Sequence, residues 1–247
     1  MNRNSAGGVE ASPDDAGKRA RAVREMFCSI APRYDFLNHL LSLGIDRSWR
    51  RTMIRMAWHP EMKDILDVAC GTGDVCFEIR ERAPEARIVG LDFSPGMLKL
   101  AAKKNDVRRA GLELLEGSAE ELPFAAGSFD LVTIAFGIRN VIDRKKALRE
   151  FYRVLRPGGR VAVLEFSRPR MPWFRALYDF YFFRILPLVG GIFAKREAYR
   201  YLPDSVARFP EPEEFSAWLE EAGFRRCRWH SLTFGIATLY HGEKENR

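Results

Sequence analysis

The sequence predicts an α/β protein whose core is a mainly parallel, seven-stranded sheet with helices on both faces. From about residue 63 onward, short apolar segments typical of buried strands alternate with amphipathic helical segments. Turns rich in Gly and Pro separate these segments, and no internal repeat interrupts them. The chain has 247 residues, which is enough for one such domain with a complete core.

The first half of the sheet is predicted from four apolar segments and the helices between them. The expected strands cover residues 64–69, 87–92, 112–115 and 130–136. A helix is expected over residues 75–82, directly after a Gly-rich turn. A second helix is expected over residues 95–107, with Ser94 as its N-cap and Pro95 at its first position.

The second half continues the alternation and then departs from it. Asp143 can cap a helix with an apolar face formed by Ala147, Leu148, Phe151, Val154 and Leu155. Residues 157–159, Pro-Gly-Gly, are expected to turn the chain into a fifth strand over 160–166. The remaining expected elements are a helix near 212–222 and strands near 225–232 and 235–241.

The elements belong to a single predicted domain over residues 18–247. Residues 1–17 are rich in Gly, Ser, Asp and Asn without apolar periodicity, so we expect a disordered lead-in. Residues 18–58 are expected to form an N-terminal helical cap over the substrate. Residues 170–200 are expected to form a helical insertion rich in aromatic side chains.

Composition bears on compartment and partners. The net charge of +7 fits three explanations: a nucleic-acid partner, an anionic membrane surface, or solubility alone. Cys28, Cys70, Cys76 and Cys227 form no C-x-x-C pair, so neither a metal site nor a disulfide framework is expected. No secretory signal is recognisable, and the sequence therefore predicts a cytoplasmic protein with free thiols.

A glycine-rich turn that begins at Asp67 follows the first predicted strand. Gly71 and Gly73 let the backbone approach a ligand closely, and the next helix offers free N–H groups to a carboxylate. Asp92 ends the second predicted strand, where its carboxylate can accept both ribose hydroxyls. NAD normally requires G-x-G-x-x-G, but Cys76 occupies the third glycine position, which favours S-adenosylmethionine.

Two further loops are expected at the same edge of the sheet. Ser118 and Ala119 follow the third strand and would lie at the rim of the cleft, beside an adenine. The loop of residues 136–140 follows the fourth strand and faces the methyl group, because ligands of open α/β sheets bind at the carboxyl ends of strands. These loops together predict a Rossmann-like class I methyltransferase that uses S-adenosylmethionine.

Two segments resemble the signatures of the quinone-biosynthesis C-methyltransferases, which make menaquinone from demethylmenaquinone and act in ubiquinone synthesis. Residues 153–167 match one signature throughout, and residues 34–49 resemble the other. This sequence departs from the second signature at two positions: Leu37 stands where methionine is usual, and Asp46 stands where histidine is usual. Residues 136–140 and 199–202 are also similar, and the resemblance extends over about residues 24–242.

The resemblance implies which residues bind the cofactor. By it, the contacting positions are Thr72, Asp92, Ser118 and Ala119, beside the two glycines of the turn. The family often has a cofactor-contacting serine directly before the Phe-Gly-x-Arg-Asn loop. Here Ala135 stands there, so that contact is lost or moves to the backbone.

The implied reaction is C-methylation of a prenylated quinol. Demethylmenaquinol is the favoured substrate, and the benzoquinol of ubiquinone synthesis, or both, is the alternative. Arg139 is expected to stabilise the phenolate, and Asn140 to orient the substrate oxygen or a water. The alternative for Arg139 is a salt bridge to a core carboxylate. Tyr34 and Asp35 complete the candidate catalytic set, with helix packing and capping as their alternative. The general base that removes the phenolic proton is not identified, and the candidates are a water, His39 and Asp35.

A prenyl tail would bring the protein to the inner face of the cytoplasmic membrane. The apolar run over residues 180–194 is interrupted by Arg184 and Pro187 and is too short to span a bilayer. An interfacial helix flanked by cations, or a lid over the tail, is expected instead. A dimer interface or a core helix is the alternative, and a homodimer is therefore included among the expected partners.

Three competing classes are disfavoured by the motifs. A nucleic-acid methyltransferase would carry an Asn/Asp-Pro-Pro-aromatic loop or a Pro-Cys nucleophile, and the sequence has neither, so no nucleic-acid partner is expected. Cys76 disfavours a nicotinamide oxidoreductase. The intact set of Gly71, Gly73 and Asp92 disfavours a binding protein without catalysis.

Overall fold

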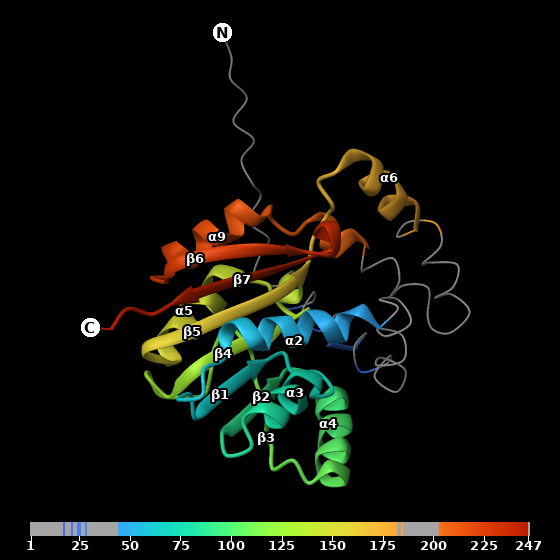
Figure 1. Cartoon of the computed structure of the whole chain (residues 1–247). Helices are drawn as coiled ribbons and strands as arrows, with labels where there is room; N and C mark the ends of the chain where they lie inside the picture. The colour runs from blue at the N-terminus through green and yellow to red at the C-terminus, as the bar shows by residue number, and fades with distance from the viewer. Residues whose placement is uncertain are drawn as a thin grey trace.

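All seven predicted strands form one sheet in the computed structural model (Figure 1). The structure describes residues 44–181, 184 and 203–246, together with 17, 21, 24, 25 and 28. The strand order is β3-β2-β1-β4-β5-β7-β6. β7 runs antiparallel to both of its neighbours, and the other pairs are parallel. The predicted mainly parallel, seven-stranded sheet is confirmed.

The observed strands lie close to their predicted ranges. Their bounds are β1 (Asp64–Val68), β2 (Arg87–Asp92), β3 (Glu113–Glu116), β4 (Phe129–Ala135), β5 (Leu155–Phe166), β6 (Arg225–Leu232) and β7 (Ala237–Glu243). The largest difference is at β5, which begins at Leu155 rather than Arg160. Leu155 already pairs with Phe129, and the ladder resumes where Arg160 pairs with Leu131, so the Pro-Gly-Gly segment is a bulge inside the strand.

Two of the described helices begin where capping chemistry predicts them. The bounds of the described helices are α2 (Ile45–Ala57), α3 (Asp74–Arg82), α4 (Pro95–Arg108), α5 (Arg144–Val154), α6 (Pro172–Phe180) and α9 (Pro212–Glu221). The Ser94 side chain caps α4 by accepting a hydrogen bond from Met97 N, and the Asp143 side chain caps α5 by accepting one from Lys146 N. Within the described residues, two short 3-10 helices, η1 (Ile138–Asn140) and η3 (Thr233–Gly235), lie in loops.

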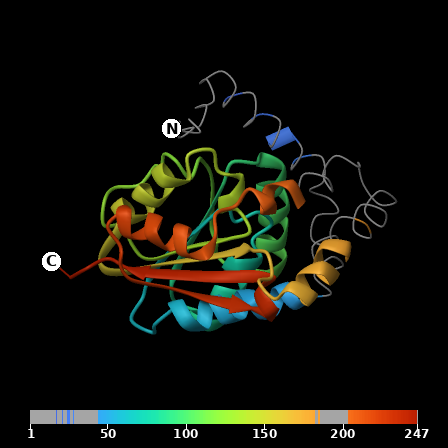
Figure 2. The same cartoon turned by 90° about the horizontal axis from the view of Figure 1, so that it is seen from above.

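Helices cover both faces of the sheet, which divides the core into two layers (Figure 2). On one face, α2 packs against β5 and β7, and α3 packs against β2. On the other face, α5 packs against β5, and α9 packs against β6 and β7. α2 belongs to the predicted N-terminal cap and α6 to the predicted aromatic insertion. Residues 1–16 of the lead-in, most of 18–43 and most of 182–202 lie outside the described residues.

The strand order places a ligand site between β1 and β4. The chain leaves β1 toward β2 and leaves β4 toward β5, so these neighbouring strands lead in opposite directions across the sheet. Open α/β sheets bind ligands at the carboxyl ends of the strands that flank such a point. Separately, no helix within the described ranges is long and apolar enough to cross a membrane.

Candidate functional site

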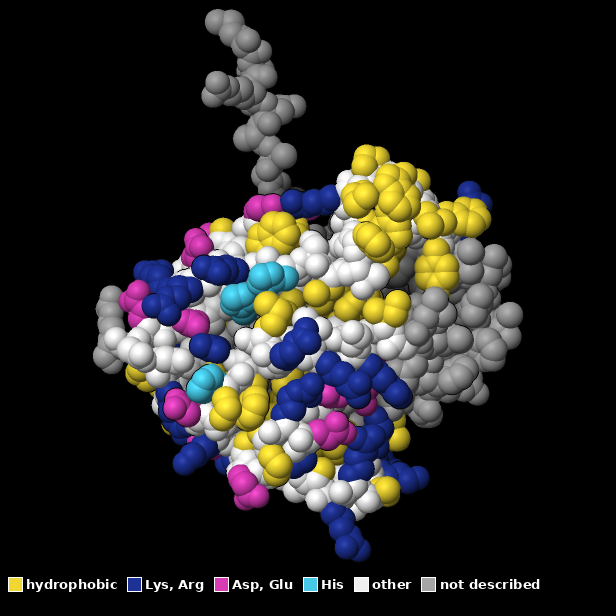
Figure 3. Space-filling model, viewed as in Figure 1, with side chains coloured by type: hydrophobic (Ala, Val, Ile, Leu, Met, Phe, Trp, Pro, Cys, Tyr) yellow, Lys and Arg dark blue, Asp and Glu magenta, His cyan; other side chains and the backbone are white. Residues whose placement is uncertain are grey.

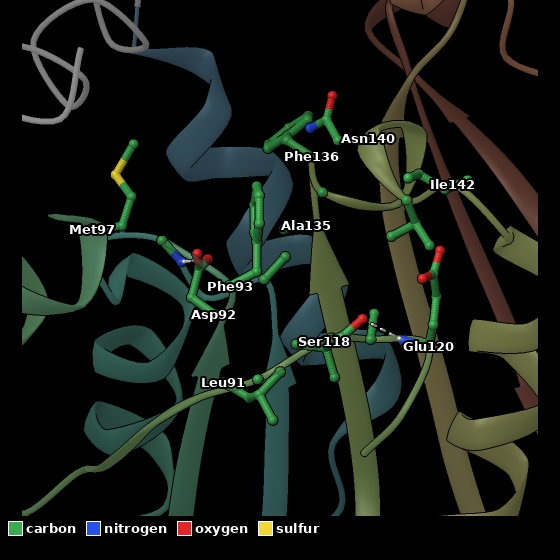
Figure 4. A pocket seen from close by; sticks show the side chains of 17 residues that line it. Leu91, Asp92, Phe93, Met97, Ser118, Glu120, Ala135, Phe136, Asn140 and Ile142 are labelled. Atoms are coloured by element: carbon green, nitrogen blue, oxygen red, sulfur yellow. Dashed lines mark hydrogen bonds between the residues drawn. The ribbon is translucent and has the colours of Figure 1, made fainter. Parts of the chain in front are cut away.

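A pocket lies at the carboxyl ends of the central strands (Figure 4). Four segments line it: the turn after β1, the end of β2 with the start of α4, the loop after β3, and the loop after β4. Asp92, Phe93 and Met97 lie on one side of the pocket, and Phe136, Asn140 and Ile142 lie on the other. Figure 4 shows Ser118 and Glu120 along the rim between the two sides. The pocket therefore occupies the position that the strand order predicts.

The turn after β1 is built around left-handed backbone conformations. Gly71 has a φ of 58° and Gly73 a φ of 87°, values that favour glycine. Ala69 adopts a φ of 51° without being glycine. An L side chain at either glycine would be strained, so the motif is explained by the backbone it must form.

Asp92 connects this turn to α4. Its Oδ2 accepts a hydrogen bond from Gly71 N and its Oδ1 one from Ser94 N, both at 2.8 Å. The carboxylate is only 4% exposed, and burial raises its pKa against the opposing effect of these N–H donors. A carboxylate can accept about four hydrogen bonds. The Phe93 backbone also hydrogen-bonds to this carboxylate, and Asp92 lines the pocket with acceptor capacity left for a ribose hydroxyl.

The predicted cofactor residues separate into two groups. Gly71, Asp92, Ser118 and Ala119 line the pocket. Thr72 and Gly73 are not among the described lining residues. The Thr72 hydroxyl instead accepts a hydrogen bond from Lys104 Nζ at 3.0 Å, and a side chain at Gly73 would meet the Phe77 ring at 3.0 Å. A direct cofactor contact through the Thr72 side chain remains a prediction.

Several lining residues were not predicted from the sequence, among them Phe93, Met97 and Glu120. Phe93 directly follows Asp92, and Met97 lies in the first turn of α4, so both were within reach of an argument from Asp92. Glu120 is fixed by its backbone N–H, which donates to Ser118 Oγ at 3.2 Å. Its side chain accepts from Asp143 N at 2.6 Å. Aromatic and thioether groups near the ribose site would suit the face of an adenine.

The loop after β4 forms the acceptor side of the pocket. Ala135, Phe136, Gly137 and Asn140 line it. Arg139 lies between them in sequence but is not among the described lining residues. It is only 6% exposed, and its guanidinium forms a 2.8 Å salt bridge with the fully buried Glu165. The alternative raised from the sequence, a salt bridge to a core carboxylate, is therefore present. Whether Arg139 also meets a substrate stays a prediction.

The remaining catalytic candidates fall outside the described part of the chain. Tyr34, Asp35 and His39 all lie between residues 29 and 43, which the structure does not describe. Within the described ranges, no group of three or more His, Cys, Asp or Glu residues is arranged to hold a metal ion.

A second buried carboxyl, Asp67, lies at the end of β1 beneath the glycine-rich turn. Its Oδ1 accepts a hydrogen bond from Thr133 Oγ1 at 2.7 Å, and its Oδ2 one from Cys76 Sγ at 3.5 Å. Burial raises the pKa of Asp67 to about 7, although these hydrogen bonds and the charge of Arg50 act in the opposite direction. Asp67 therefore titrates near neutral pH in the folded protein.

The pKa of Asp67 predicts how stability depends on pH. Because the folded pKa lies above the ordinary value of 3.8, the folded state binds this proton more tightly than the unfolded state. The resulting stabilisation is complete below about pH 4 and is lost as pH rises through about 7. Asp67→Asn removes the titration, so the variant should gain stability relative to wild type over this window, by up to roughly 4 kcal/mol. Urea unfolding at several pH values measures the difference, and a pH-independent difference would contradict the assignment.

Comparison with known proteins gives one family. A model described as the ubiE/COQ5 methyltransferase family matches residues 15–244. The ubiquinone/menaquinone biosynthesis C-methyltransferase UbiE of Geotalea daltonii is 51% identical over 230 residues, covering 92% of this chain and 98% of its own. The demethylmenaquinone methyltransferase of Thermus thermophilus is 50% identical over 220 residues, covering 89% of this chain and all of its own.

Solved structures share the fold at much lower identity. A SAM-dependent methyltransferase from Thermotoga maritima, titled a possible histamine N-methyltransferase, has a TM-score of 0.64 at 22% identity and covers 90% of this chain and 99% of its own. The [4+2]-cyclase SpnF has a TM-score of 0.71 at 15% identity and covers 92% and 97%. Their different titles show that this likeness concerns the architecture alone. It agrees with the Rossmann-like class predicted from the sequence.

Proposed function

The chain belongs to the ubiE/COQ5 methyltransferase family, and from this premise we propose that it transfers a methyl group from S-adenosylmethionine to a ring carbon of a prenylated quinol. Demethylmenaquinol is the favoured acceptor, and the benzoquinol of ubiquinone synthesis is the second candidate. Relatives named demethylmenaquinone methyltransferase favour demethylmenaquinol. A relative named for both ubiquinone and menaquinone biosynthesis is the reason to retain the benzoquinol as a candidate. The observation that carries the proposal is Asp92 fixed beside the glycine-rich turn, opposite the loop of residues 136–140.

The pocket residues fit S-adenosylmethionine, which supplies an electrophilic methyl group on a sulfonium when bound. The remaining acceptor capacity of Asp92 suits a ribose hydroxyl. Phe93 and Met97 would pack against the adenine, with Ser118 and Ala119 at its edge. Gly117 allows the close approach of this loop, because a side chain there would meet Leu91 at 2.8 Å.

On the acceptor side, residues must orient the quinol and favour its phenolate, because a phenolate raises electron density at the ring carbon that is methylated. Asn140 lines the pocket and would orient a substrate oxygen. Arg139 would donate to the phenolate. Tyr178 is close enough to Arg139 for the arginine charge to act on its hydroxyl. Burial raises the pKa of this hydroxyl, so it stays protonated and is a poor base. Asp35, His39 and a water remain the candidate bases, with Tyr34 as a further catalytic candidate.

The direct test is a methyl-transfer assay. Purified protein would be given labelled S-adenosylmethionine with demethylmenaquinol or the demethyl benzoquinol, each kept reduced, and the products would be identified by mass spectrometry. We expect methylation at a ring carbon, with demethylmenaquinol the better acceptor. Quinone profiles of cells lacking the gene should show accumulation of the same acceptor. Transfer to neither quinol would refute the proposal, and preference for the benzoquinol would select the second candidate.

We further propose that the protein contacts the membrane surface through α6. Trp173, Leu177 and Phe180 are 63%, 58% and 58% exposed, and their spacing places them on one face of the helix. Phe234 of η3 is 64% exposed, and its ring packs 5.2 Å from that of Phe174. Figure 3 shows hydrophobic side chains gathered over α6. Such a ridge suits insertion among lipid chains, where a prenyl tail resides.

The charges around this ridge favour apolar insertion over attraction to anionic headgroups. Arg168 and Arg175 both face Asp179, at 2.9 and 3.9 Å. Arg170 pairs with Glu213 and lies 3.5 Å from Glu211. Each of these three arginines thus has an acidic partner within the described residues. The part of lipid binding that depends on α6 should therefore depend weakly on salt.

Vesicle sedimentation tests this contact. The double variant Trp173→Ser, Leu177→Ser should bind phosphatidylcholine vesicles at least tenfold more weakly than wild type, because burying each large apolar side chain contributes roughly 1.5–3 kcal/mol. Val107→Ser is the matched control, since Val107 is 78% exposed on α4, away from the ridge. If the double variant binds vesicles normally but loses self-association, the ridge is instead a homodimer interface.

A further inference from the structure

Glu165 is a fully buried carboxylate near the end of β5, behind the acceptor side of the pocket. Its Oε1 accepts hydrogen bonds from Arg139 Nη1 and from Phe166 N, both at 2.8 Å. Its Oε2 accepts one from Arg139 N at 3.2 Å. A buried carboxylate is costly unless donors surround it. Two of these donors belong to Arg139, so Glu165 fixes both the backbone and the side chain of that residue.

The same guanidinium holds a strained residue of the loop. Phe136 adopts a φ of 58°, which is uncommon outside glycine. Its carbonyl accepts a hydrogen bond from Arg139 Nη1, and its N–H donates to Leu164 O at 2.7 Å. Its ring lies 4.5 Å from that of Phe166. Strained residues persist only where their surroundings over-determine them, and here one Arg139 nitrogen joins Phe136 to Glu165.

The strained loop supplies the side chains that meet an acceptor. Phe136 and Asn140 both line the pocket, and Arg139 lies between them in sequence. We propose that Glu165 is a positioning residue for methyl transfer, which holds Arg139 and the loop of residues 136–140 in the conformation that presents Phe136 and Asn140 to the acceptor. This inference rests on the proposed function, since it assigns Glu165 a role in that reaction.

The pairing also determines how Arg139 can act. Its Nε is buried and has no hydrogen-bond partner within the described residues. Glu165 offsets the guanidinium charge, so Arg139 would stabilise a phenolate through a directed N–H rather than through net charge. Directed donors in a low-dielectric site cost no reorganisation during the reaction. Glu165 is what would keep such a donor in place.

The chain contains a matched control for this arrangement at the opposite end of the same strand pair. Asp130, at the start of β4, accepts hydrogen bonds from Lys63 N, Asp64 N and Arg156 Nη1 at 2.7–2.9 Å. Like Glu165, it therefore receives two backbone N–H groups and one arginine. It differs in being partly exposed, with 21% of its side chain accessible, and in lying at the amino end of β4, away from the pocket.

The experiment compares Glu165→Gln with Asp130→Asn in the quinol methylation assay and in calorimetry with S-adenosylmethionine. For Glu165→Gln we expect kcat to fall about 100-fold while cofactor affinity and the quinol KM change less than threefold. For Asp130→Asn we expect kcat within threefold of wild type, whatever its effect on the melting temperature. Glu165→Asp, which keeps the charge, should recover part of the lost kcat.

Retention of kcat in Glu165→Gln, or a parallel loss of kcat and cofactor binding, would overturn the inference. If Glu165→Gln does not fold, the double variant Arg139→Met, Glu165→Met removes the pair without leaving a buried charge. That variant should bind the cofactor and lose at least as much kcat, and full activity in it would also overturn the inference. Wild-type protein inactive on every quinol would refute the proposed function instead, so the two failures are distinguishable.

Discussion

Asp92→Ala should weaken the binding of S-adenosylmethionine by roughly 100-fold or more, without unfolding the protein. The carboxylate would contact the ribose, and it also accepts hydrogen bonds from Gly71 N and Ser94 N. Removing it leaves these backbone donors unpaired at a buried position, at a cost of about 1–3 kcal/mol for each group. The ribose contact and the support of the glycine-rich turn are lost together.

Calorimetry on Asp92→Ala and Asp92→Asn separates these contributions. Asparagine keeps one acceptor oxygen and loses the other, so its affinity should lie between those of alanine and wild type. Circular dichroism before titration confirms that both variants are folded. If Asp92→Ala bound the cofactor as tightly as wild type, neither the ribose contact nor the support of the turn could be important, and the pocket would need another ligand.

Local chemistry was sufficient to predict much of the fold. Helix starts followed from single capping residues, because Ser94 with Pro95, and Asp143, satisfy the free N–H groups of the first turn. The pocket followed from the strand alternation, which places the ends of β1, β2 and β4 at one edge. The bulge in β5 was not predicted. It depends on Leu155 pairing with Phe129, a contact that the Pro-Gly-Gly pattern does not reveal.

Site residues were predictable from the sequence where the backbone conformation requires a particular residue type. They were less predictable where the side chain bonds to a residue distant in sequence. Gly71 and Asp92 follow from the turn and the strand end. The side chain of Arg139 is held by Glu165, from another strand, and a pattern of residue types cannot distinguish a paired arginine from one that faces a ligand. The same holds for Thr72, whose hydroxyl meets Lys104 from α4.

A comparable long-range contact leaves less room for a side chain at Gly137 than at Gly117, the other glycine of the pocket wall that contacts a neighbouring element closely. A Cβ at Gly137 would lie 2.6 Å from Ala69 Cβ and 3.3 Å from Ile134 Cγ1. Ala69 Cβ moves only with its backbone, which belongs to the turn after β1. The glycine is therefore required by the close approach of two loops, since its φ of −111° is open to any residue.

Gly137→Ala should consequently reduce kcat about 100-fold, because separating the two loops by a fraction of an ångström displaces both sides of the pocket. Gly127→Ala is the control, since a side chain there meets nothing within 4 Å and introduces only the strain of a 68° φ. The decisive variant is Gly137→Ala combined with Ala69→Gly, which removes the clashing methyl and relieves the 51° φ of Ala69. Steady-state kinetics should show the double variant recovering most of the lost kcat. If it stays as impaired as Gly137→Ala alone, contact with Ala69 is not the cause, and the requirement for glycine must come from the substrate side of the pocket.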